Sequence, residues 1–453
     1  MKVLASRFLL FLAVLPSAAL TVFWAAWFIP AAASMGWPDI AKGVSSIFAQ
    51  NCLVILVILV ILGSRNSLVE PFLGLDRMLR YHKPLAVIAI ALLLVHVLLQ
   101  FLRFYIMGGP GLVKAALLTM DIWEMVIGRF ALILLIMASV AALLGKQFRL
   151  SFRLWKPVHL LVYAAVPMGI IHAWFRGSTI GESPRVQVVV VLIGAMTIAL
   201  VMRLVEVLRG KRRAVCRVSR VVQETHDTKT VYLNALRGLN HLGHRRPGQF
   251  ALLRIPRGRG LSEPHPFTIS GEPTEKELRF TIKQAGRFTR EIHAVKPGVE
   301  VRCEGPYGIF CAGAEERDSL ALIAGGVGVT PFFSLLRHLL VNGKDIPTVL
   351  IWANKSRRDI FGQRELEGMT GKMPLCVVHV LSREKEDLGK PTSGNNVKFE
   401  KGRVTAELLG RFLREDQDFY LCGPPAMQTF VLGEIKKAFG LGARRVSRES
   451  FFW

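Results

Sequence analysis

Long apolar runs dominate residues 1–210 of this 453-residue chain, whereas the remainder alternates short apolar and polar stretches. Each run has about 20 residues, the length that a helix needs to cross a hydrocarbon core about 30 Å thick. The first run follows Lys2 and Arg7, as in a signal peptide, but it continues through Trp24 and Trp27, which favours a retained helix. The pattern predicts six transmembrane helices, over residues 8–30, 44–63, 84–106, 123–145, 155–175 and 186–208.

Lysine and arginine are distributed unequally between the two ends of these runs. One side carries Lys2, Arg7, Arg65, Arg77, Arg80, Lys83, Lys146, Arg149, Arg153, Lys156, Arg209, Lys211, Arg212 and Arg213. The other side carries Lys42, Arg103, Lys114, Arg176 and Arg185. Because short cytoplasmic loops are enriched in Lys and Arg, the first side is predicted to be cytoplasmic. We therefore expect a multi-pass protein of the cell (inner) membrane, with both termini and the whole polar half in the cytoplasm.

Two of the predicted helices carry two histidines each. The third has His96 within it and His82 just before its first apolar residue, and the fifth contains His159 and His172. Intramembrane ionisable residues are costly and usually functional. At 1.5 Å per residue the spacings of 14 and 13 residues are about 21 and 20 Å. The two helices run in the same direction, so His82 can face His159 near the cytoplasmic side and His96 can face His172 near the outer side. This arrangement predicts two haems, each held by two histidines and stacked about 20 Å apart.

The spacing of 13 residues does not return to the same helix face, whereas 14 residues nearly does. Pro167 lies between His159 and His172, so we expect a kink or bulge there that re-aims His172. Zinc is the rival metal, but zinc sites favour histidines one turn apart. These histidines are four turns apart with no carboxylate or thiolate nearby, which favours haem.

Net charge and cysteine usage exclude other classes of protein. The net charge of +25 suggests nucleic-acid binding. Many basic residues, however, lie at the ends of apolar runs and no nucleic-acid motif is found, which argues against it. The six cysteines form no C-x-x-C pair, which argues against an iron–sulfur cluster, a zinc ribbon and covalent haem attachment. Five of the six lie in the polar half, as suits a reducing cytoplasm.

The polar half divides into two patterns. Residues 211–314 contain strand-like segments separated by Gly, Pro and charged turns, which predicts an antiparallel β-barrel; the segments are 215–222, 230–233, 249–255, 277–283 and 300–304. Residues 315–453 alternate buried strands with helices, which predicts a parallel α/β sheet. The predicted strands are 320–324, 348–352, 375–381 and 419–422, and the predicted helices are 331–342, 404–414 and 425–439.

A glycine-rich turn follows the first of these buried strands and opens a helix. Its candidate nucleotide-binding residues are Gly325, Gly326, Gly328, Thr330 and Pro331. Glycines there permit a tight turn and close backbone approach, so that a pyrophosphate can rest on the helix N-terminus. The strand–turn–helix context strengthens what would otherwise be a weak motif.

Taken together, the chain resembles the NADPH oxidase and ferric reductase superfamily over nearly its whole length. In the membrane half the resemblance lies in the histidine spacings and in Asn51-Cys52, Arg65-Asn66, Leu75-Asp76-Arg77 and Tyr81-His82-Lys83. It implies two b-type haems, with His82 and His159 as the inner ligands and His96 and His172 as the outer ligands. The polar half resembles the ferredoxin–NADP reductase superfamily, which implies an FAD-binding barrel and an NAD(P)H-binding domain.

Two further motifs resemble that superfamily's flavin site. His265-Pro266-Phe267-Thr268 resembles the flavin signature, which implies that Pro266, Phe267 and Thr268 line the isoalloxazine and that His265 lies near the phosphates. The Thr268 hydroxyl can hydrogen-bond the flavin ring. Gly286-Arg287-Phe288-Thr289, after Ile282 and Lys283, resembles the segment that holds the FAD pyrophosphate, with Arg287 and helix-start amides as the positive groups.

The nicotinamide side is implied by the C-terminal motifs. Cys422-Gly423-Pro424 resembles the loop beside the nicotinamide, with Cys422 near the hydride-donating carbon. Glu449-Ser450-Phe451 resembles an acidic–x–Phe ending whose aromatic covers the flavin, and the two extra residues leave either Phe451 or Trp453 as that aromatic. Arg357 and Arg358 follow the second strand, where cations can pair with the 2′-phosphate of NADPH or remain solvated; NADPH is favoured over NADH.

The resemblance implies electron transfer from NAD(P)H through FAD and the two haems to an acceptor outside the membrane. The favoured acceptor is O2, giving superoxide. Superoxide-producing relatives place an Arg and a His where an ungapped count finds Lys42 and Gln100, which weakens that assignment and keeps a ferric-chelate or other metal reductase as the close alternative. A haem protein that reduces a membrane partner or quinone is a further alternative. No calcium loop or docking segment is recognised, so no regulatory subunit is expected.

Overall fold

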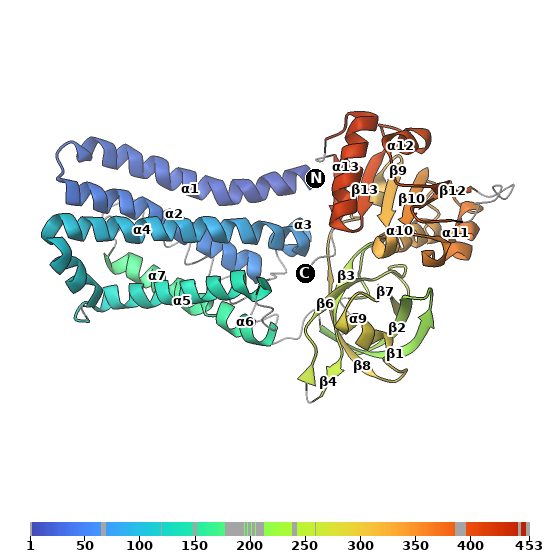
Figure 1. Ribbon diagram of the computed structural model, residues 1–453, viewed down its shortest axis with the longest axis horizontal. Coiled ribbons are helices and arrows are strands. Elements are labelled where there is room, and N and C mark those ends of the chain that lie inside the picture. The colour runs from blue at the N-terminus through green and yellow to red at the C-terminus, as the bar shows by residue number, and fades with distance from the viewer. Residues whose placement is uncertain are drawn as a thin grey trace. The chain divides into compact units, whose positions relative to one another are not determined.

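The computed structural model describes residues 2–64, 69–118, 120–147, 152–176, 213–237, 242–258, 260–385, 396–442 and 445–449, together with residues 194, 197, 201 and 204. The chain divides into two compact units, residues 1–205 and 206–453. The first unit is helical and the second contains the two large sheets (Figure 1). Each unit is described by itself.

The helical unit contains seven described helices (Figure 1). They are α1 (Lys2–Ala32), α2 (Trp37–Gly63), α3 (Glu70–Leu73), α4 (Leu75–Leu118), α5 (Trp123–Gln147), α6 (Phe152–His159) and α7 (Val162–Arg176). Five stretches of the described residues are long and apolar enough to cross a membrane: Leu15–Ala32, Trp37–Gly63, Leu75–Leu118, Trp123–Leu144 and Leu154–Phe175. They correspond to the first five predicted spans. The sixth predicted span, residues 186–208, lies outside the described residues except for four isolated positions.

Helix α2 lies at the centre of the helical unit. It packs against α1, α4 and α7, and its side chains from Cys52 to Val60 belong to one buried cluster. Ala89 of α4, Leu135 of α5 and Ala165 of α7 join that cluster. Ala89 and Ala165 are small, which allows α4 and α7 to approach α2 closely, as is usual for packing within a bilayer.

Two helices depart from the predicted form. Helix α4 extends well beyond the predicted 84–106 and bends at Gly108 and Gly109, where the φ of Gly109 is 64° and Pro110 follows. The interruption expected between His159 and His172 exists, but the prediction placed it wrongly at Pro167. Helix α7 continues through Pro167, and the break lies at Leu160 and Leu161, between α6 and α7. There the amides of Leu161 and Ala164 bond three residues back instead of four, at 3.1 and 3.0 Å.

The first lobe of the second unit is built on a six-stranded antiparallel sheet of order β6-β3-β8-β1-β2-β7. Its strands are β1 (Arg213–Gln223), β2 (Thr228–Arg237), β3 (Phe250–Arg254), β6 (His265–Thr268), β7 (Glu277–Lys283) and β8 (Glu300–Tyr307), with a β4–β5 hairpin (Pro256–Arg257 and Gly260–Leu261) and helix α9 (Arg287–His293). Within the described residues no ladder joins β6 to β7, although the Ser270 amide, just after β6, donates to the Arg279 carbonyl of β7 at 2.8 Å. The structure shows the antiparallel sheet, and closure into a barrel stays a prediction.

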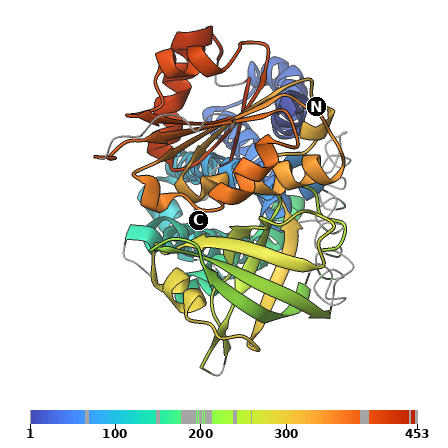
Figure 2. The same ribbon diagram turned by 90° about the vertical axis from the view of Figure 1, so that its right-hand side faces the viewer.

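The second lobe is a six-stranded parallel sheet of order β12-β11-β10-β9-β13-β14 (Figure 2). Its strands are β9 (Leu320–Gly325), β10 (Thr348–Asn354), β11 (Leu375–Leu381), β12 (Val397–Lys401), β13 (Asp418–Cys422) and β14 (Val446–Glu449). The helices are α10 (Thr330–Val341), α11 (Gln363–Thr370), α12 (Ala406–Phe412) and α13 (Pro425–Phe439), with short turns η2 (Ala314–Glu316), η3 (Gly326–Val329) and η4 (Arg357–Asp359). One apolar core lies on the α10–α11 face and another on the α12–α13 face, which explains the continuously apolar strands.

Candidate functional site

The inner pair of predicted haem ligands is brought together by α4 and α6. The ring centroids of His82 and His159 are 6.2 Å apart and their planes are inclined by 71°. A metal–imidazole bond is about 2 Å long and a ring nitrogen lies about 1 Å from its centroid, so two histidines on opposite sides of one metal have centroids about 6 Å apart. The observed separation therefore fits a metal ion between the two rings.

The remaining ring nitrogens of this pair have different surroundings. The Nδ1 atom of His159 lies 3.3 Å from the carbonyl oxygen of Ala138 on α5. The Nδ1 atom of His82 is buried and has no hydrogen-bond partner among the described residues. A Cβ added to Gly63 of α2 would lie 3.5 Å from the His82 ring, so the glycine leaves room for the imidazole.

The outer pair, His96 of α4 and His172 of α7, is close enough for the two rings to interact electrostatically. The Nδ1 atom of His172 lies 2.8 Å from the carbonyl oxygen of Glu124. The Nδ1 atom of His96 lies 2.8 Å from the Ser45 hydroxyl and 3.1 Å from the Ser45 carbonyl. Metal-bound histidines usually donate their second ring N–H to such oxygens, which leaves Nε2 for the metal.

Helix α5 makes close contact with the outer pair. A Cβ added to Gly128 would lie 2.6 Å from Nδ1 of His172, a distance at which atoms overlap. Glycine is therefore required at this position for His172 to keep its place.

The two flavin motifs, which begin 21 residues apart in the sequence, meet in the structure. The ring of His265 on β6 stacks on Phe288 of α9 with centroids 3.9 Å apart, and Phe267 stacks on the same ring at 5.7 Å. The hydroxyl of Thr268 is buried and has no hydrogen-bond partner among the described residues. A buried hydroxyl without a partner is rare, and it is what a flavin hydrogen-bond site would leave in the ligand-free protein.

Other residues of the predicted FAD site have partners within the protein. The Thr289 hydroxyl accepts hydrogen bonds from the amides of Ala285 and Gly286, and exposed Arg287 pairs with Glu291 at 2.8 Å. The Ile282 side chain packs in the apolar core of the first lobe and not on its surface.

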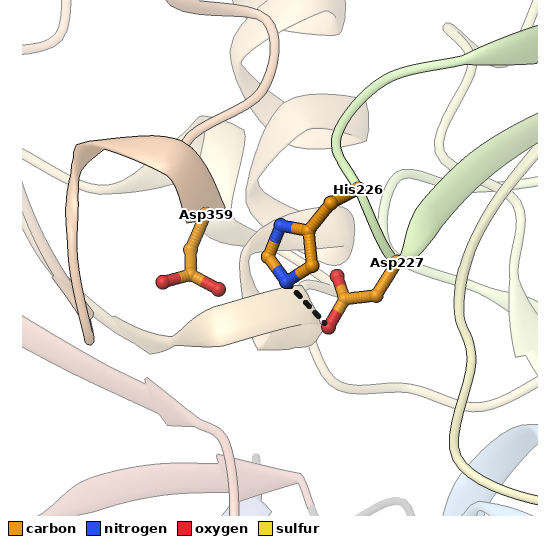
Figure 3. Close-up of side chains that lie close together, drawn as sticks. All are labelled: His226, Asp227 and Asp359. Atoms are coloured by element: carbon orange, nitrogen blue, oxygen red, sulfur yellow. Dashed lines mark ion pairs between the residues drawn. The ribbon is translucent and has the colours of Figure 1, made fainter.

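Lys283 joins the two lobes of the second unit. Its ammonium lies 2.9 Å from Asp227 on the first lobe and 3.5 Å from Asp359 on the second. Figure 3 shows Asp227 and Asp359 converging with His226, whose ring lies 3.6 Å from Asp227. Three such side chains could bind a metal ion. The Lys283 ammonium pairs with both carboxylates and neutralises one of their two charges, so we assign the cluster to lobe–lobe pairing.

The glycine-rich turn contacts the Cys-Gly-Pro loop. A Cβ on Gly328 would lie 2.6 Å from the Cys422 carbonyl oxygen, and one on Gly325 would overlap Sδ of Met427 and lie 3.1 Å from Pro424. Gly326 has open space but a φ of 54°, which favours glycine. Two of the three glycines therefore serve loop-to-loop packing, and the third serves the turn.

The end of this turn is equally ordered. The Thr330 hydroxyl donates to the Val327 carbonyl at 3.0 Å, and Pro331 stands in the first turn of α10, where a missing amide hydrogen costs nothing. Both residues therefore shape the helix start.

Cys422 ends β13 beside the last residue of β14. Its side chain is fully buried, and burial together with the Glu449 carboxylate raises the pKa of its thiol, so the thiol is protonated at neutral pH. Gln428 donates to the carbonyls of Gly423 and Glu449 at 2.9 and 2.7 Å and joins the two strand ends. The carboxylate of Glu449 was absent from the predicted site, although its place in the C-terminal motif was the available signal. Phe451 and Trp453 lie outside the described residues.

The predicted 2′-phosphate residues lie at the carboxyl end of β10. The Arg357 guanidinium lies 4.4 Å from the ring centroid of Phe399, and its amide donates to Glu384 at 2.9 Å. Arg358 is exposed to solvent. The Asp359 carboxylate accepts from the amide and hydroxyl of Ser356, which holds the loop in its turn.

Comparison with known families accounts for all three parts of the chain. The family described as "Ferric reductase like transmembrane component" matches residues 48–170. An FAD-binding domain family matches residues 217–310, and the oxidoreductase NAD-binding domain family matches residues 322–432. The chain has the architecture of the NADPH oxidase/ferric reductase superfamily. It is an oxidoreductase.

Individual relatives of this superfamily member match its second half. The sulfhydrogenase 2 subunit gamma of Pyrococcus furiosus is 32% identical over 198 residues, which are 42% of this chain and 66% of the relative. The glycine betaine monooxygenase reductase subunit of Pseudomonas aeruginosa is 27% identical over 245 residues, 53% of this chain and 64% of the relative. The chain thus spans less than two thirds of these curated relatives.

Solved structures match more distantly. A flavohemoglobin from Malassezia yamatoensis is 17% identical with a TM-score of 0.49, covering 92% of this chain and 98% of that chain. The cytochrome b5 reductase domain of Ulva prolifera nitrate reductase is 19% identical with a TM-score of 0.43, covering 53% of this chain and 97% of that chain. Likenesses at this level carry no argument about function.

Proposed function

We propose that this chain transfers electrons across the cell (inner) membrane, from cytoplasmic NAD(P)H through FAD and two b-type haems to an acceptor on the opposite side. Membrane-associated, NAD(P)H-dependent electron transfer through a flavin follows from the three matched families. The observation that carries the haem assignment is the separation of 6.2 Å between the rings of His82 and His159, which lie on different helices.

Each proposed cofactor has its own set of residues. His82 and His159 would hold the inner haem, and His96 and His172 the outer haem. The fit rests on the Nδ1–oxygen contacts of three of these histidines, which leave Nε2 for the iron. FAD would bind where the orphaned Thr268 hydroxyl meets the stacked His265 and Phe288 rings, and NAD(P)H beside Cys422 and the glycine-rich turn. When bound, FAD accepts two electrons at once and the haems take them singly.

The buried thiol of Cys422 stays protonated at neutral pH. It therefore supplies a small, uncharged surface beside the nicotinamide. Phe451 or Trp453 would cover the flavin until the nucleotide displaces it. Lys283 would keep the loop of Arg357 and Arg358 aligned with the FAD lobe through its pair with Asp359.

The favoured acceptor is O2, which would take one electron at the edge of the outer haem and leave as superoxide. His96 and His172 would both bind that iron, so O2 would not bind to it directly. One observation favours a ferric chelate as the second candidate. The Gln100 amide, expected near the acceptor, donates to Ser45 at 3.1 Å on the Nδ1 side of His96. A metal chelate reduced at the haem edge needs no such group.

We assign residues 1–210 to the di-haem membrane domain, 211–314 to the FAD domain and 315–453 to the NAD(P)H domain. Both termini are proposed to be cytoplasmic, with the lipid bilayer and NAD(P)H as partners and no regulatory subunit.

The first test is haem content and electron transfer in detergent-purified protein supplied with FAD. Wild type should hold two haems per chain, His96→Ala should hold one, and reduction of FAD by NADPH should persist in both. His244→Ala, at an exposed histidine, is the matched control and should keep two haems. Two haems in His96→Ala would refute the ligand assignment.

The acceptor is tested on the same preparation with a dismutase-sensitive probe, with and without ferric chelate. Superoxide formed at the rate of NADPH consumption supports an oxidase. Fast chelate reduction with little superoxide supports a metal reductase, and electron transfer only after addition of a quinone or membrane partner supports the third alternative.

A further inference from the structure

Ser45 lies behind the outer histidine of α4. Its side chain is fully buried in α2. Its hydroxyl oxygen lies 2.8 Å from Nδ1 of His96 and 3.1 Å from the His96 carbonyl oxygen. The side-chain amide of Gln100 donates to the same hydroxyl oxygen at 3.1 Å. One hydroxyl thus joins the ring, the backbone and a side chain one helical turn away.

The protons of this network can be assigned if His96 is an iron ligand, and the assignment therefore rests on the proposed function. With Nε2 bound to iron, a neutral imidazole has its hydrogen on Nδ1. The Nδ1–H group then donates to Ser45, the Ser45 O–H donates to the His96 carbonyl, and Gln100 donates to Ser45. Every donor has an acceptor, so the network is internally consistent.

The other three proposed ligands lack such a network among the described residues. His159 and His172 use backbone carbonyls for Nδ1, and Nδ1 of His82 has no partner. A backbone acceptor is the same whatever the residue, whereas a serine hydroxyl depends on one side chain. Nδ1 of His96 lies 3.1 Å from the Ser45 backbone carbonyl and, closer, 2.8 Å from the Ser45 hydroxyl. The outer ligand on α4 is therefore the one whose second nitrogen has a side-chain acceptor in addition to a backbone one.

We infer that Ser45 and Gln100 are positioning residues that orient His96 and lower the reduction potential of the outer haem, and that Gln100 acts through Ser45 without contacting the electron acceptor. An acceptor for Nδ1–H increases the basicity of the ligand and so stabilises the oxidised iron. Gln100 holds the hydroxyl in place because its amide lies on the face of α4 that His96 also occupies.

The test is a potentiometric titration of the full-length protein with both haems bound. The outer haem is the component missing from His96→Ala. In Ser45→Ala its midpoint potential should rise, because one acceptor is lost, while the inner haem stays at the wild-type value. Ser45→Cys keeps the side-chain volume and offers a weak acceptor, so its outer-haem midpoint potential should lie between those of wild type and Ser45→Ala.

Ser46→Ala is the matched control. Ser46 is the next residue of α2, and its hydroxyl donates to the Lys42 carbonyl at 2.9 Å within the same helix. Both potentials should stay at wild type. An equal rise in Ser46→Ala, or no rise in Ser45→Ala with two haems present, overturns the inference. If Ser45→Ala loses the outer haem, the titrations of Ser45→Cys and Gln100→Leu take its place. A shifted outer-haem potential in these variants supports the inference, and wild-type potentials in both overturn it.

Gln100→Leu separates action through Ser45 from contact with the acceptor. It should shift the outer potential, and the same change made in Ser45→Ala should shift it no further, while the KM for the acceptor stays constant. A changed acceptor KM, or an additional shift in the double variant, contradicts the inference. Failure of the proposed function is distinguishable, because a protein without that function shows no two-haem spectrum in wild type.

Discussion

Gly328 is the residue at which the nucleotide lobe should be most sensitive to one added methyl group. In Gly328→Ala the new Cβ would lie 2.6 Å from the Cys422 carbonyl oxygen, 2.8 Å from its carbonyl carbon and 2.9 Å from Cα of Gly423. These are backbone atoms at the end of a buried strand, so no side chain can rotate away. Overpacking costs about 1–3 kcal/mol, and a rigid neighbour places this change near the upper limit, about 3 kcal/mol.

For a unit of 150–250 residues, each kcal/mol lowers Tm by about 2–4 °C, so Gly328→Ala should lower Tm by about 6–12 °C. The measurement is thermal release of FAD fluorescence from the full-length protein. The KM for NAD(P)H should also rise, because the methyl group separates the two loops that are proposed to flank the nicotinamide. Gly368→Ala is the control, since its Cβ meets nothing within 4 Å and lies in α11. The free energy of unfolding of Gly368→Ala should be higher than that of wild type by about 0.5–1 kcal/mol. If the Tm of Gly328→Ala lies within about 2 °C of wild type, which corresponds to about one kcal/mol, the two loops can move apart to accept the methyl group and the reasoning is refuted.

Three further predictions concern the second unit. His379→Phe should stabilise it by about 1–3 kcal/mol, because neither buried ring nitrogen has a partner among the described residues. Burial lowers the pKa of His379 to about 4. Between pH 6.5 and 4 the unfolded chain therefore binds a proton that the folded protein does not, and the free energy of unfolding falls as the pH falls. This part of the acid destabilisation should be absent in His379→Phe. Burial raises the pKa of Glu272, but hydrogen bonds from Thr274 and His338 outweigh burial and lower it overall. Glu272→Gln should therefore lower Tm at pH 7, with the difference disappearing as the pH falls below about 4, the unfolded-state value. Lys283→Met should raise the KM for NAD(P)H with little change in kcat, because it removes the ion pairs of Lys283 that connect the two lobes. The free energy of unfolding should change by less than about 1 kcal/mol.

Each of these predictions has an outcome that contradicts it. Equal acid sensitivity of wild type and His379→Phe would mean that the histidine has a partner in solution. A pH-independent effect of Glu272→Gln would exclude its ionised form as the stabilising one. For Lys283→Met the matched change is Lys398→Met, whose ammonium lies over the Phe412 ring and pairs no lobes. Equal KM values in these two variants would remove Lys283 from nucleotide positioning.

Local patterns predicted the elements well where one physical factor dominates. The span of α5 and the limits of β7 and α13 follow from uninterrupted apolar runs or from the sequence period. The predicted start of the third span at residue 84 was late, because the charged segment from Leu75 to Lys83 is helical as well. Charge marks the end of an apolar run, but it does not end a helix.

Contacts between distant residues could not be predicted in the same way. Ser45 is one of two adjacent serines in α2, and its partner His96 is 51 residues away. The sequence marked Gln100 only as the residue that stands where superoxide-producing relatives have a His, and it gave no sign of the hydrogen bond from Gln100 to Ser45.

The two histidine spacings have different structural meanings. In α4 no break separates His82 from His96, and 14 residues at 100° each leave them about 40° apart around the axis, so the spacing itself directs both rings to one side. Thirteen residues of unbroken helix would leave His159 and His172 about 140° apart. The break at Leu160 and Leu161 ends α6 immediately after His159 and starts α7 with a new phase, so the direction of each ring is set by a separate helix. Proline was the visible signal for this break, yet α7 continues through Pro167, because the turn that re-aims the chain had already been made. The sequence therefore showed that a break was needed, and only the hydrogen bonds of Leu161 and Ala164 show where it lies.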